Sequence, residues 1–478
     1  MTVTVAKLDG SSEQLPDDAV SGLRAQLRGQ LVVCDDPQAA SEPRPVWNAM
    51  HADRAAITVR CAGTADVVDA VNFAREHGLL VAVRGGGHSV AGLSTVRDGM
   101  LIDLSAMRGV QVDPERRLAR VQGGAVLGDV DRETQAFGLV TPLGRVSDTG
   151  VAGLTLGGGV GHLGNRYGLS CDNVVEAQVV CADGQVRTAS ADSHPDLYWA
   201  VRGGGGNFGV VTSFTFRLHP VGPIVGFAGV FYPLEDLPEI GRRWRDYVTA
   251  APDEVTPMLV SLTFPAAPDM PEIIHNRQVA IVAGVHCGDL DAGMQALQPL
   301  RELGTPLFDM SQPMPYTILQ SAFDPFFPRQ ASRAYWKSTY LDELTDDAVD
   351  TIARKALDRP APMTGIGAFH FGGAVHAVGA QDTAFAERSA PFLISVDTTW
   401  DDPAQDTAAI AWGRGTWEEI SKYGNGNVFL NFTGLADESP LSFVNNAFGR
   451  NLRRLAQIKA TYDPHNLFRI NNNIIPAP

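Results

Sequence analysis

Apolar residues in the stretch 55–220 follow two different periods, and segments with each period alternate along the chain. Residues 57–60 and 79–83 form short apolar runs typical of strands, whereas residues 64–77 repeat apolar positions at helical spacing. This alternation predicts a sheet with helices packed on it. Further elements are expected as hairpins over 109–121 and 174–188, a helix over 125–137 and a strand over 210–218.

Beyond Pro220 the pattern changes to longer strands that alternate with amphipathic helices. This pattern predicts a large, mostly antiparallel sheet with helices covering one face. The strands are expected at 226–232, 255–264, 278–286, 333–341, 367–371, 392–400 and 427–432, and helices are expected to begin near residues 234, 292, 345 and 406.

The chain of 478 residues is therefore expected to form two domains of the α+β class. The first is expected at 1–220, with a regular core at about 55–220, and the second at 221–442. The segment 443–478 is polar again and is expected to return to the first domain. Residues 1–50 are polar and rich in proline, and the apolar stretch that ends them, around Trp47, is expected to dock on the body.

Composition excludes several classes of protein. Apolar residues make up 44% of the chain and charged residues 19%, which suits a substantial core. The net charge of −16, without a basic run, argues against a nucleic-acid partner. The longest apolar stretches fall short of a membrane span, and the N-terminus lacks the pattern of a signal peptide. The five cysteines are widely spaced without a C-x-x-C pair, which predicts neither disulfides nor a metal site and fits a reducing cytoplasm.

Many of the 49 glycines gather in three runs, at 84–89, 142–164 and 202–209, each beside a predicted strand. Glycine lets a backbone approach a ligand closely and lets several amides point at it. Three such runs favour one long, flat, anionic ligand such as FAD or NAD, although each run alone could form only a tight turn. Two matches to G-x-G-x-x-G, beginning at Gly159 and Gly204, lack the strand before and the helix after that a Rossmann motif needs.

His88 directly follows the first glycine run, in a loop that leaves a predicted strand. An imidazole in that place could act as a general base, a ligand contact or a nucleophile toward an activated carbon. It could equally be an ordinary loop histidine held by backbone hydrogen bonds. Its sequence neighbours do not complete a metal site.

Several motifs taken together resemble the FAD-linked oxidases of the berberine-bridge type, in the vanillyl-alcohol-oxidase superfamily. They are RGGGHS at 84–89, the run at 142–164 and YGLSCDNVVEAQVVCADG at 167–184. The resemblance continues through 196–220 and resumes at 462–474, so it covers most of the chain. It implies a two-domain PCMH-type fold, with an FAD-binding domain at 1–220 and a substrate domain at 221–442.

In such proteins the histidine after R-G-G-G carries the flavin covalently through its 8α carbon, a role that falls here on His88. A neutral imidazole nitrogen held beside that electrophilic carbon can add to it. The implied cofactor contacts are Arg84, Gly85, Gly86, Gly87 and Ser89 at the pyrophosphate, Ser147, Gly150, Val151, Gly153, Gly157, Gly158, Gly161 and His162 along the rest of the cofactor, Gly209 and Val210 on the adenosine side, and Asn471 and Asn473 in the C-terminal segment.

The sequence departs from the family pattern at two places. Val146 stands where many relatives have a cysteine that forms a second flavin tether, so a single covalent bond is expected. Where many relatives have a Y-x-N motif with a tyrosine base beside the flavin, this chain has Phe429 and Asn431. Strand alternation would point both toward the site, but a phenylalanine cannot take a proton.

A replacement for this base has to come from neighbouring strands. Tyr335 is the first candidate and His370 the second, and a tyrosine could serve if nearby positive charge lowered its pKa. Each of them could equally be an ordinary packing residue of the sheet. The missing tyrosine suits an amine or an already acidic hydroxyl, because such groups need less help in losing a proton.

The sequence thus predicts a flavoprotein oxidase that takes hydride from a C–H next to oxygen or nitrogen of a small molecule. Dioxygen would be the second substrate and hydrogen peroxide a product. Two alternatives stay open: a dehydrogenase of the same fold with another electron acceptor, and a flavoprotein with a non-redox cyclisation or binding role.

Overall fold

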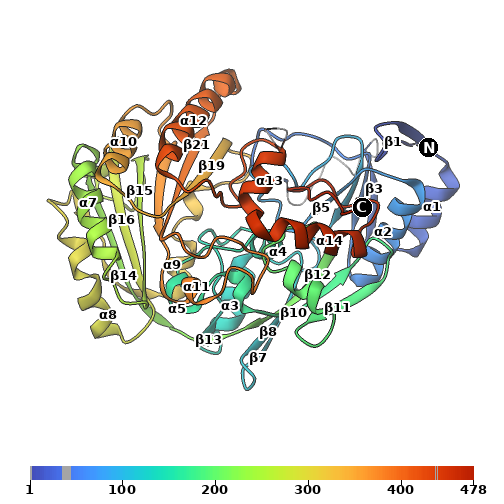
Figure 1. Ribbon diagram of the computed structural model, residues 1–478, viewed down its shortest axis with the longest axis horizontal. Coiled ribbons are helices and arrows are strands. Elements are labelled where there is room, and N and C mark those ends of the chain that lie inside the picture. The colour runs from blue at the N-terminus through green and yellow to red at the C-terminus, as the bar shows by residue number, and fades with distance from the viewer. Residues whose placement is uncertain (1–2, 35–44, 437, 439) are drawn as a thin grey trace.

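The chain forms layers of sheet and helix in which an eight-stranded sheet occupies one side of the molecule (left in Figure 1). A four-stranded sheet lies on the opposite side, and a five-stranded sheet lies low in the centre. This computed structural model describes residues 3–34, 45–436, 438 and 440–478. The α+β class and the large antiparallel sheet expected from the sequence are confirmed.

The four-stranded sheet has the order β3-β4-β6-β5 and begins the regular part of the chain. Its strands are β3 (Gln30–Val33), β4 (Ile57–Arg60), β5 (Val81–Arg84) and β6 (Met100–Asp103). Both β4 and β5 run parallel to β6, as the helical crossover α2 (Thr64–His77) between them requires. This helix ends at Gly78, whose φ of 62° needs glycine, and the chain enters the sheet directly afterwards.

The five-stranded sheet is antiparallel, with the order β11-β10-β12-β8-β7. The two hairpins expected from the sequence are confirmed as its β7–β8 and β10–β11 pairs. Its strands are β7 (Val110–Asp113), β8 (Leu118–Gln122), β10 (Val174–Val180), β11 (Val186–Ser190) and β12 (Val210–Arg217). The helix α3 (Leu127–Gln135) contacts β7, and α6 (Pro195–Ala200) contacts β11. The short helices α4 (Val151–Leu156) and α5 (Gly164–Tyr167) lie in the connection between β9 (Leu139–Val140) and β10, and α5 contacts the eight-stranded sheet.

The eight-stranded sheet has the order β17-β14-β16-β15-β20-β21-β19, with β18 added beside β14. Every pairing in it is antiparallel. Its strands are β14 (Ile224–Pro233), β15 (Val255–Phe264), β16 (Arg277–His286), β17 (Phe308–Asp309), β18 (Gln312–Pro315), β19 (Arg333–Leu341), β20 (Gly365–His370) and β21 (Phe392–Trp400).

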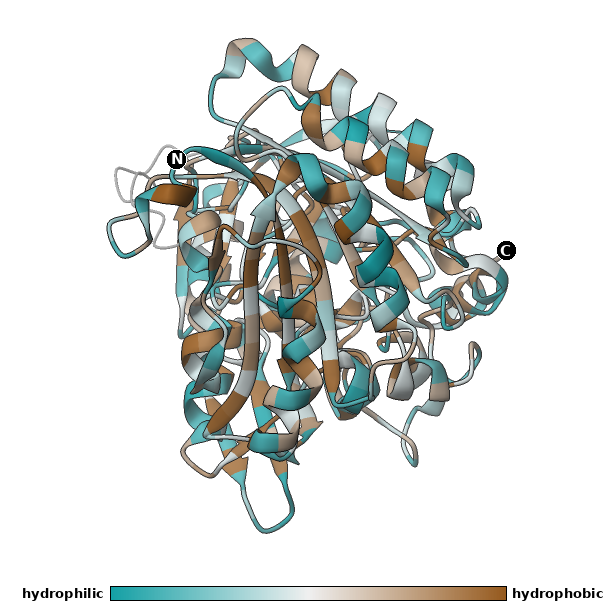
Figure 2. Cartoon of the chain, turned by 90° about the vertical axis from the view of Figure 1, so that its left-hand side faces the viewer, coloured by the Kyte–Doolittle hydropathy of each residue, from teal (hydrophilic) through white to brown (hydrophobic). Residues whose placement is uncertain are grey.

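Four helices cover one face of this sheet: α7 (Leu237–Val248), α8 (Leu290–Leu297), α10 (Asp346–Leu357) and α12 (Asp406–Ile420). Figure 2 shows teal, hydrophilic residues on these helices and brown, hydrophobic residues along the strands that they cover. Trp244 of α7 and Ile394 of β21 belong to the same buried core. The opposite face of the sheet is left for the cavity described below.

Residues 427–432 form neither strand nor helix, so the strand expected there is wrong. This segment makes isolated contacts with β19 but does not pair with it as a strand. The amide of Tyr340 donates to the carbonyl of Asn427, the amide of Phe429 donates to the Ser338 hydroxyl, and Thr433 makes an isolated bridge with Lys337. A side-chain acceptor thus replaces the regular ladder.

The C-terminal helices α13 (Pro440–Phe448) and α14 (Leu452–Tyr462) lie across the centre of Figure 1, and α14 contacts α6. Phe448 and Leu455 share a core with Phe214 of β12. The remaining elements are β1 (Val3–Ala6), β2 (Ser12–Leu15), α1 (Asp17–Gln26), β9 (Leu139–Val140), β13 (His219–Pro220), α9 (Tyr316–Ser321) and α11 (Gly373–Ala377).

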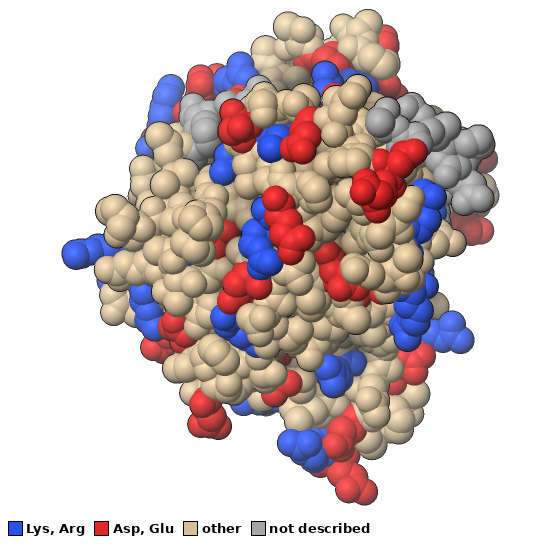
Figure 3. All heavy atoms as spheres, turned by 90° about the vertical axis from the view of Figure 1, so that its right-hand side faces the viewer, with Lys and Arg blue, Asp and Glu red and all other residues tan. Residues whose placement is uncertain are grey.

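The surface and the N-terminal stretch bear on three further expectations. On the face in Figure 3, Lys and Arg of the described residues lie among Asp and Glu and form no continuous basic stripe. Within the described ranges, no helix is both long and apolar enough to cross a membrane. Trp47 is only 1% exposed and packs on the body, whereas residues 35–44 of the polar N-terminal stretch lie outside the described residues.

Candidate active site

A cavity of about 430 Å³ lies between the glycine loops and the open face of the eight-stranded sheet. One wall consists of loops after β5, around α4, before β12 and in the C-terminal segment 468–472. The other wall consists of side chains from β15, β16, β19, β20 and β21. This size is typical of ligand and cofactor sites.

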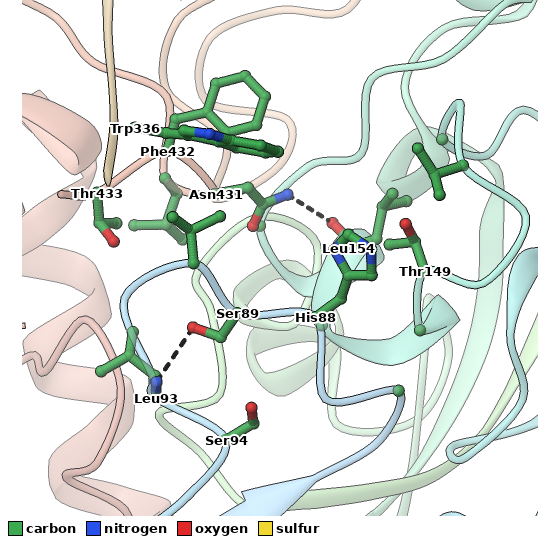
Figure 4. A pocket seen from close by; sticks show the side chains of 18 of the residues that line it. His88, Ser89, Leu93, Ser94, Thr149, Leu154, Trp336, Asn431, Phe432 and Thr433 are labelled. Atoms are coloured by element: carbon green, nitrogen blue, oxygen red, sulfur yellow. Dashed lines mark hydrogen bonds between the residues drawn. The ribbon is translucent and has the colours of Figure 1, made fainter. Parts of the chain in front are cut away.

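Many of the residues singled out in the sequence line this cavity. They are Gly85, Gly86, Gly87, His88, Ser89, Gly150, Gly153, Gly157, Gly209, Val210, Phe429, Asn431 and Asn471, together with Val146. Figure 4 shows His88, Ser89 and Asn431 on the cavity wall, where the Asn431 amide donates to the Leu154 carbonyl at 3.2 Å.

Seven of the predicted cofactor contacts lie behind the wall. Arg84 is buried and donates to the Ser94 carbonyl, Ser147 donates to Asp324, and the side-chain amide oxygen of Asn473 accepts from Lys459. The others are Val151, Gly158, Gly161 and His162, which pack into the protein around the loop. Glycine spacing marks the loop, but it does not tell which of its residues face the ligand.

The glycines serve two separate purposes. Gly86 and Gly150 stand back to back, since a Cβ on Gly86 would lie 2.3 Å from the Cα of Gly150. The first two glycine runs therefore pack directly on each other. By contrast, Gly153 and Gly206 line the cavity and have no described atom within 4 Å of the place where a Cβ would be. Side chains at these two positions would project into the cavity, so their absence leaves room for a ligand.

His88 is held by ring stacking and its Nε2 is buried without a hydrogen-bond partner among the described residues. The ring stacks on Trp47, with centroids 4.9 Å apart and planes at 14°. Burial, and to a smaller extent the charge of Arg329, lowers the pKa of His88 to about 4. The imidazole is therefore neutral at physiological pH and keeps a nitrogen lone pair available.

Arg329 joins the loops around His88. Its guanidinium donates to the Gly86 carbonyl at 2.6 Å, to the Pro45 carbonyl at 3.0 Å and to the Asp148 carbonyl at 2.9 Å, and it pairs with the Asp148 carboxylate. Five residues before it, Asp324 accepts from the amide and the hydroxyl of Ser147. The segment before β19 therefore fixes two glycine loops at once.

Three more buried polar atoms of residues in the cavity wall lack a hydrogen-bond partner among the described residues, namely Oγ of Ser94, Nε of Arg145 and Oδ1 of Asn471. Buried polar atoms normally have a partner, so these atoms, like Nε2 of His88, are open to a ligand. An extended ligand with an aromatic ring system and several polar groups matches this wall. The residues present therefore fit a flavin dinucleotide.

The structure corrects the orientation expected for Tyr335. It lies on the helix-covered face of the sheet, where it packs beside Trp400 and Ala409 and donates to the Glu438 carboxylate at 2.5 Å. Its neighbour Trp336 faces the cavity instead. Burial and Glu438 raise the pKa of Tyr335, which is the opposite of what a phenolic base needs.

His370 also lies outside the cavity lining. On β20, Gly365 and Phe369 face the cavity, so His370 points with Ile366 and Ala368 toward the helices. Its ring contacts Phe392 edge to face at 5.5 Å. Burial lowers the pKa of His370 to about 4, and the imidazole cannot reach a ligand in the cavity.

Asp397 is a cavity residue that the sequence analysis missed. It stands on β21 directly opposite Trp336 of β19, and both side chains face the cavity. Its carboxylate accepts from the Ser395 hydroxyl at 2.8 Å. Burial raises the pKa of Asp397 to about 7. An acidic residue inside the apolar strand 392–400 was the available signal.

Arg145 is the cationic side chain near the other end of this sheet wall. Its guanidinium lies 4.4 Å above the ring of Phe369 and donates to the Gly161 carbonyl at 3.2 Å. Burial lowers the pKa of Arg145 to about 10, so it stays charged at neutral pH. Burial lowers the pKa of His162, and the charge of Arg145 contributes to the same lowering.

Comparison with known proteins gives two family matches. Residues 55–190 match the model of an FAD binding domain, and residues 428–475 match that of berberine and berberine-like proteins. An FAD-linked oxidoreductase of Bacillus subtilis, YgaK, is 30% identical over 459 residues, which cover 95% of this chain and 98% of that protein.

Solved structures agree with these matches. The structure of 6-hydroxy-D-nicotine oxidase from Arthrobacter nicotinovorans is 26% identical, has a TM-score of 0.82, and matches over 94% of this chain and 98% of its own. Berberine bridge enzyme, in a variant with (S)-reticuline bound, has a TM-score of 0.85 at 22% identity over 97% of this chain and 99% of its own. The latter likeness concerns the fold.

Proposed function

Because this chain belongs to the berberine-bridge-like family of FAD-linked oxidoreductases, we propose that it is an oxidase of small molecules with covalently bound FAD. The family resemblance inferred from the sequence motifs is confirmed, and the chain is an enzyme with FAD as its cofactor. The proposal adds hydride removal from a C–H next to oxygen or nitrogen, dioxygen as acceptor, and His88 as the tether.

Bound FAD supplies a two-electron acceptor for this hydride, and the electrons then pass to dioxygen to give hydrogen peroxide. The residues of this chain hold the cofactor and present the substrate. The packed loops around Gly86 and Gly150 form one side of the cleft, and the open face of the eight-stranded sheet forms the other. Two reactants held between such walls meet in a fixed orientation, which is a large part of catalysis.

The state of His88 is the observation that carries the proposed tether. Its imidazole is neutral and lines the cavity, and its buried Nε2 has no hydrogen-bond partner among the described residues. A nitrogen in that state can form the bond to the flavin's 8α carbon. Val146 also lines the cavity, and its side chain offers no sulfur for a second bond.

Intact-mass spectrometry of the purified, acid-denatured protein tests this assignment. We expect a yellow protein whose mass exceeds that of the polypeptide by one FAD, and a His88→Ala variant from which acid releases all flavin. The same preparation, reduced by light and mixed with aerated buffer, should regain its colour within seconds and form one peroxide per flavin. A colourless protein contradicts the whole proposal, and an FAD-sized increment that survives His88→Ala contradicts the tether.

A further inference from the structure

Resting on the proposed function, we propose that the substrate carries a carboxylate on an apolar body and that the Arg145 guanidinium binds this carboxylate. The observation behind this is a cationic side chain that lines the cavity and pairs with no carboxylate in the described part of the chain. Arg145 would thereby select the substrate, and the oxidisable C–H would lie between this anchor and the proposed flavin tether.

The protein satisfies the guanidinium of Arg145 only in part. Among the described residues its hydrogen-bond acceptor is the Gly161 carbonyl, at 3.2 Å, and its Nε is buried without a partner. The centre of the Phe369 ring lies 4.4 Å from the guanidinium carbon. A cation–π contact and one carbonyl replace only part of the hydration that burial removes. Buried charges are normally paired, and here the cavity is the place from which the counter-ion can come.

The carboxylates of the neighbouring segments already have other partners. Asp148, three residues after Arg145, pairs with Arg329. Asp324, from the segment before β19, accepts from the amide and the hydroxyl of Ser147. Neither carboxylate therefore serves as the counter-ion of Arg145, although both belong to the segments that build this part of the cavity wall.

Asp397 lies too far along the sheet to pair with Arg145. Its partner on β20 is Gly365, whereas Phe369, the ring beside Arg145, lies four residues further along that strand. At about 3.3 Å per residue, the two levels are about 13 Å apart. The cavity therefore has an acidic end and a basic end, and an anion bound at Arg145 stays clear of Asp397.

The other titratable side chain beside Arg145 is neutral. Burial, with a contribution from the charge of Arg145, lowers the pKa of His162 to about 3, and its ring stacks on Phe323 with centroids 5.7 Å apart. Arg145 itself, with a pKa of about 10, is protonated at neutral pH. A single positive charge thus dominates this end of the cavity, and local potential, more than the net charge of −16, decides what binds there.

The wall around the guanidinium is apolar. Met258, Leu393 and Phe429 line the cavity and share a core with Phe369. Such a wall accepts a hydrocarbon or aromatic body and offers few partners for the hydroxyls of a sugar. A guanidinium presents a planar set of N–H donors that matches the two oxygens of a carboxylate. The site therefore favours a carboxylic acid with an apolar body over a polyhydroxylated substrate.

The carboxylate anchor and the proposed tether lie at different places along the sheet. Trp336, at the level of Asp397, contacts Trp47, and Trp47 stacks on His88 at 4.9 Å. A substrate held at Arg145 by its carboxylate can therefore extend its apolar body toward the side of the cavity where the flavin would be attached.

Binding of paired acids and amides to the intact flavoprotein tests the anion site. The probes are phenylacetate, 3-phenylpropionate and 4-phenylbutyrate, each compared with its uncharged primary amide at pH 7.5 and followed through the flavin absorption spectrum. The two members of a pair have nearly the same size, so their affinities differ mainly through the charge. We expect at least one acid to bind at least 10-fold more tightly than its amide. If none does, the proposal is overturned.

Three variants assign this preference to one side chain. In Arg145→Met we expect the Kd values of acid and amide to agree within 3-fold, with the Kd of the amide unchanged, and in Arg145→Lys we expect part of the preference to return. The matched control is Arg354→Met, which removes an exposed guanidinium paired with Glu419 on the helix-covered side of the same sheet and should keep the full preference.

Two results with these variants contradict the assignment. An Arg145→Met protein that still prefers the acid shows that the anion binds elsewhere. A variant that keeps the preference but has a changed flavin reduction potential shows that Arg145 serves the flavin and not the substrate. Both results overturn the proposal.

Anaerobic stopped-flow reduction of the flavin tests the substrate class. The panel consists of benzylic alcohols and amines, each with and without a ring carboxyl group, such as 4-(hydroxymethyl)benzoate and benzyl alcohol. We expect the best substrate to be a carboxylate and to lose at least 10-fold in efficiency in Arg145→Met. A yellow, oxygen-reactive protein whose best substrate lacks a carboxylate overturns this inference and leaves the oxidase assignment intact. A protein without flavin overturns the proposed function itself.

Discussion

At the scale of single residues, burial acts on two cavity side chains in opposite directions. It lowers the pKa of His88 to about 4 and raises that of Asp397 to about 7, because in both cases loss of water disfavours the charged form. The result is a neutral nitrogen beside the proposed cofactor position and a weak acid elsewhere in the same cavity. One physical effect thus sets the charge of both groups.

The raised pKa of Asp397 predicts a pH-dependent change in stability. An aspartate in the unfolded chain has a pKa of about 3.9, so between about pH 4 and 7 the folded state holds the extra proton. The contribution of Asp397 to stability is therefore present below pH 4 and is lost as the pH rises through 7. Asp397→Asn removes this loss, and we expect the variant to gain about 1–2 kcal/mol over the wild type at pH 8, relative to pH 5.

Thermal unfolding of the flavoprotein at pH 5, 6, 7 and 8 measures this gain. The difference in Tm between Asp397→Asn and the wild type should grow with pH, whereas Asp347→Asn, which changes an exposed carboxylate on α10, should show a constant difference. If the difference in Tm for Asp397→Asn is the same at all four pH values, the pKa of Asp397 in the folded protein is not raised.

At the scale of elements, the segment between α9 and β19 controls the geometry of the glycine loops. Asp324 and Arg329 lie five residues apart in it, and they bind Ser147 in one loop and Gly86 in the other. Arg329 also contributes the positive charge that helps to keep His88 neutral. The connection between α9 and β19, which belongs to the eight-stranded sheet, therefore positions the residue proposed to carry the flavin.

Arg329→Met tests this positioning role. Without the guanidinium, the Gly86 carbonyl and Asp148 lose their hydrogen-bond donor, so the loop that carries His88 is held less firmly. The pKa of His88 also rises, so a larger fraction of the imidazole is protonated. We expect the fraction of acid-stable flavin to fall several-fold while FAD still binds non-covalently. The ratio of flavin in the acid precipitate to flavin in the supernatant measures it. Arg301→Met, which removes a peripheral pair with Asp309, should leave that ratio unchanged.

The elements also show what sequence patterns could and could not predict. The strands Val255–Phe264, Arg333–Leu341 and Phe392–Trp400 were predicted with their observed ends, because long apolar strands between polar turns are well marked. Alternation tells which residues share a face, but both faces of Arg333–Leu341 carry aromatic residues. The pattern therefore could not tell that Trp336, and not Tyr335, faces the cavity.

Asp397 shows a second limit of the same kind. A carboxylate in an apolar strand is visible in the sequence, but whether a cation lies beside it depends on neighbouring strands that are far away in the chain. The glycine runs, by contrast, mark the cavity from local sequence alone, because close backbone packing leaves few residue types to choose from.

At the scale of the whole molecule, a buried ion pair links the loop before β21 of the eight-stranded sheet to the turn before β10, and this turn contacts α4 of the loop wall. Arg388, in the loop before β21, donates two hydrogen bonds to Asp172, in the 3₁₀ turn Ser170–Asn173 before β10, at 2.8 and 2.7 Å. The side chains are 3% and 7% exposed, and Arg388 also donates to Thr383. The pair thus connects the five-stranded sheet to the eight-stranded sheet.

Removing one partner of this pair should cost more than removing both. Arg388→Met leaves the Asp172 carboxylate buried without its cation, and we expect a loss of about 3–5 kcal/mol in the free energy of unfolding. Asp172→Asn should cost a similar amount by leaving the guanidinium unpaired. The double variant removes both charges, so its loss should be well below the sum, and urea unfolding of all four proteins measures this coupling. Additive losses would mean that each residue acts through its own loop. A coupling of more than about 2 kcal/mol would mean that one charged contact holds the loop before β21 to the turn that contacts the loop wall.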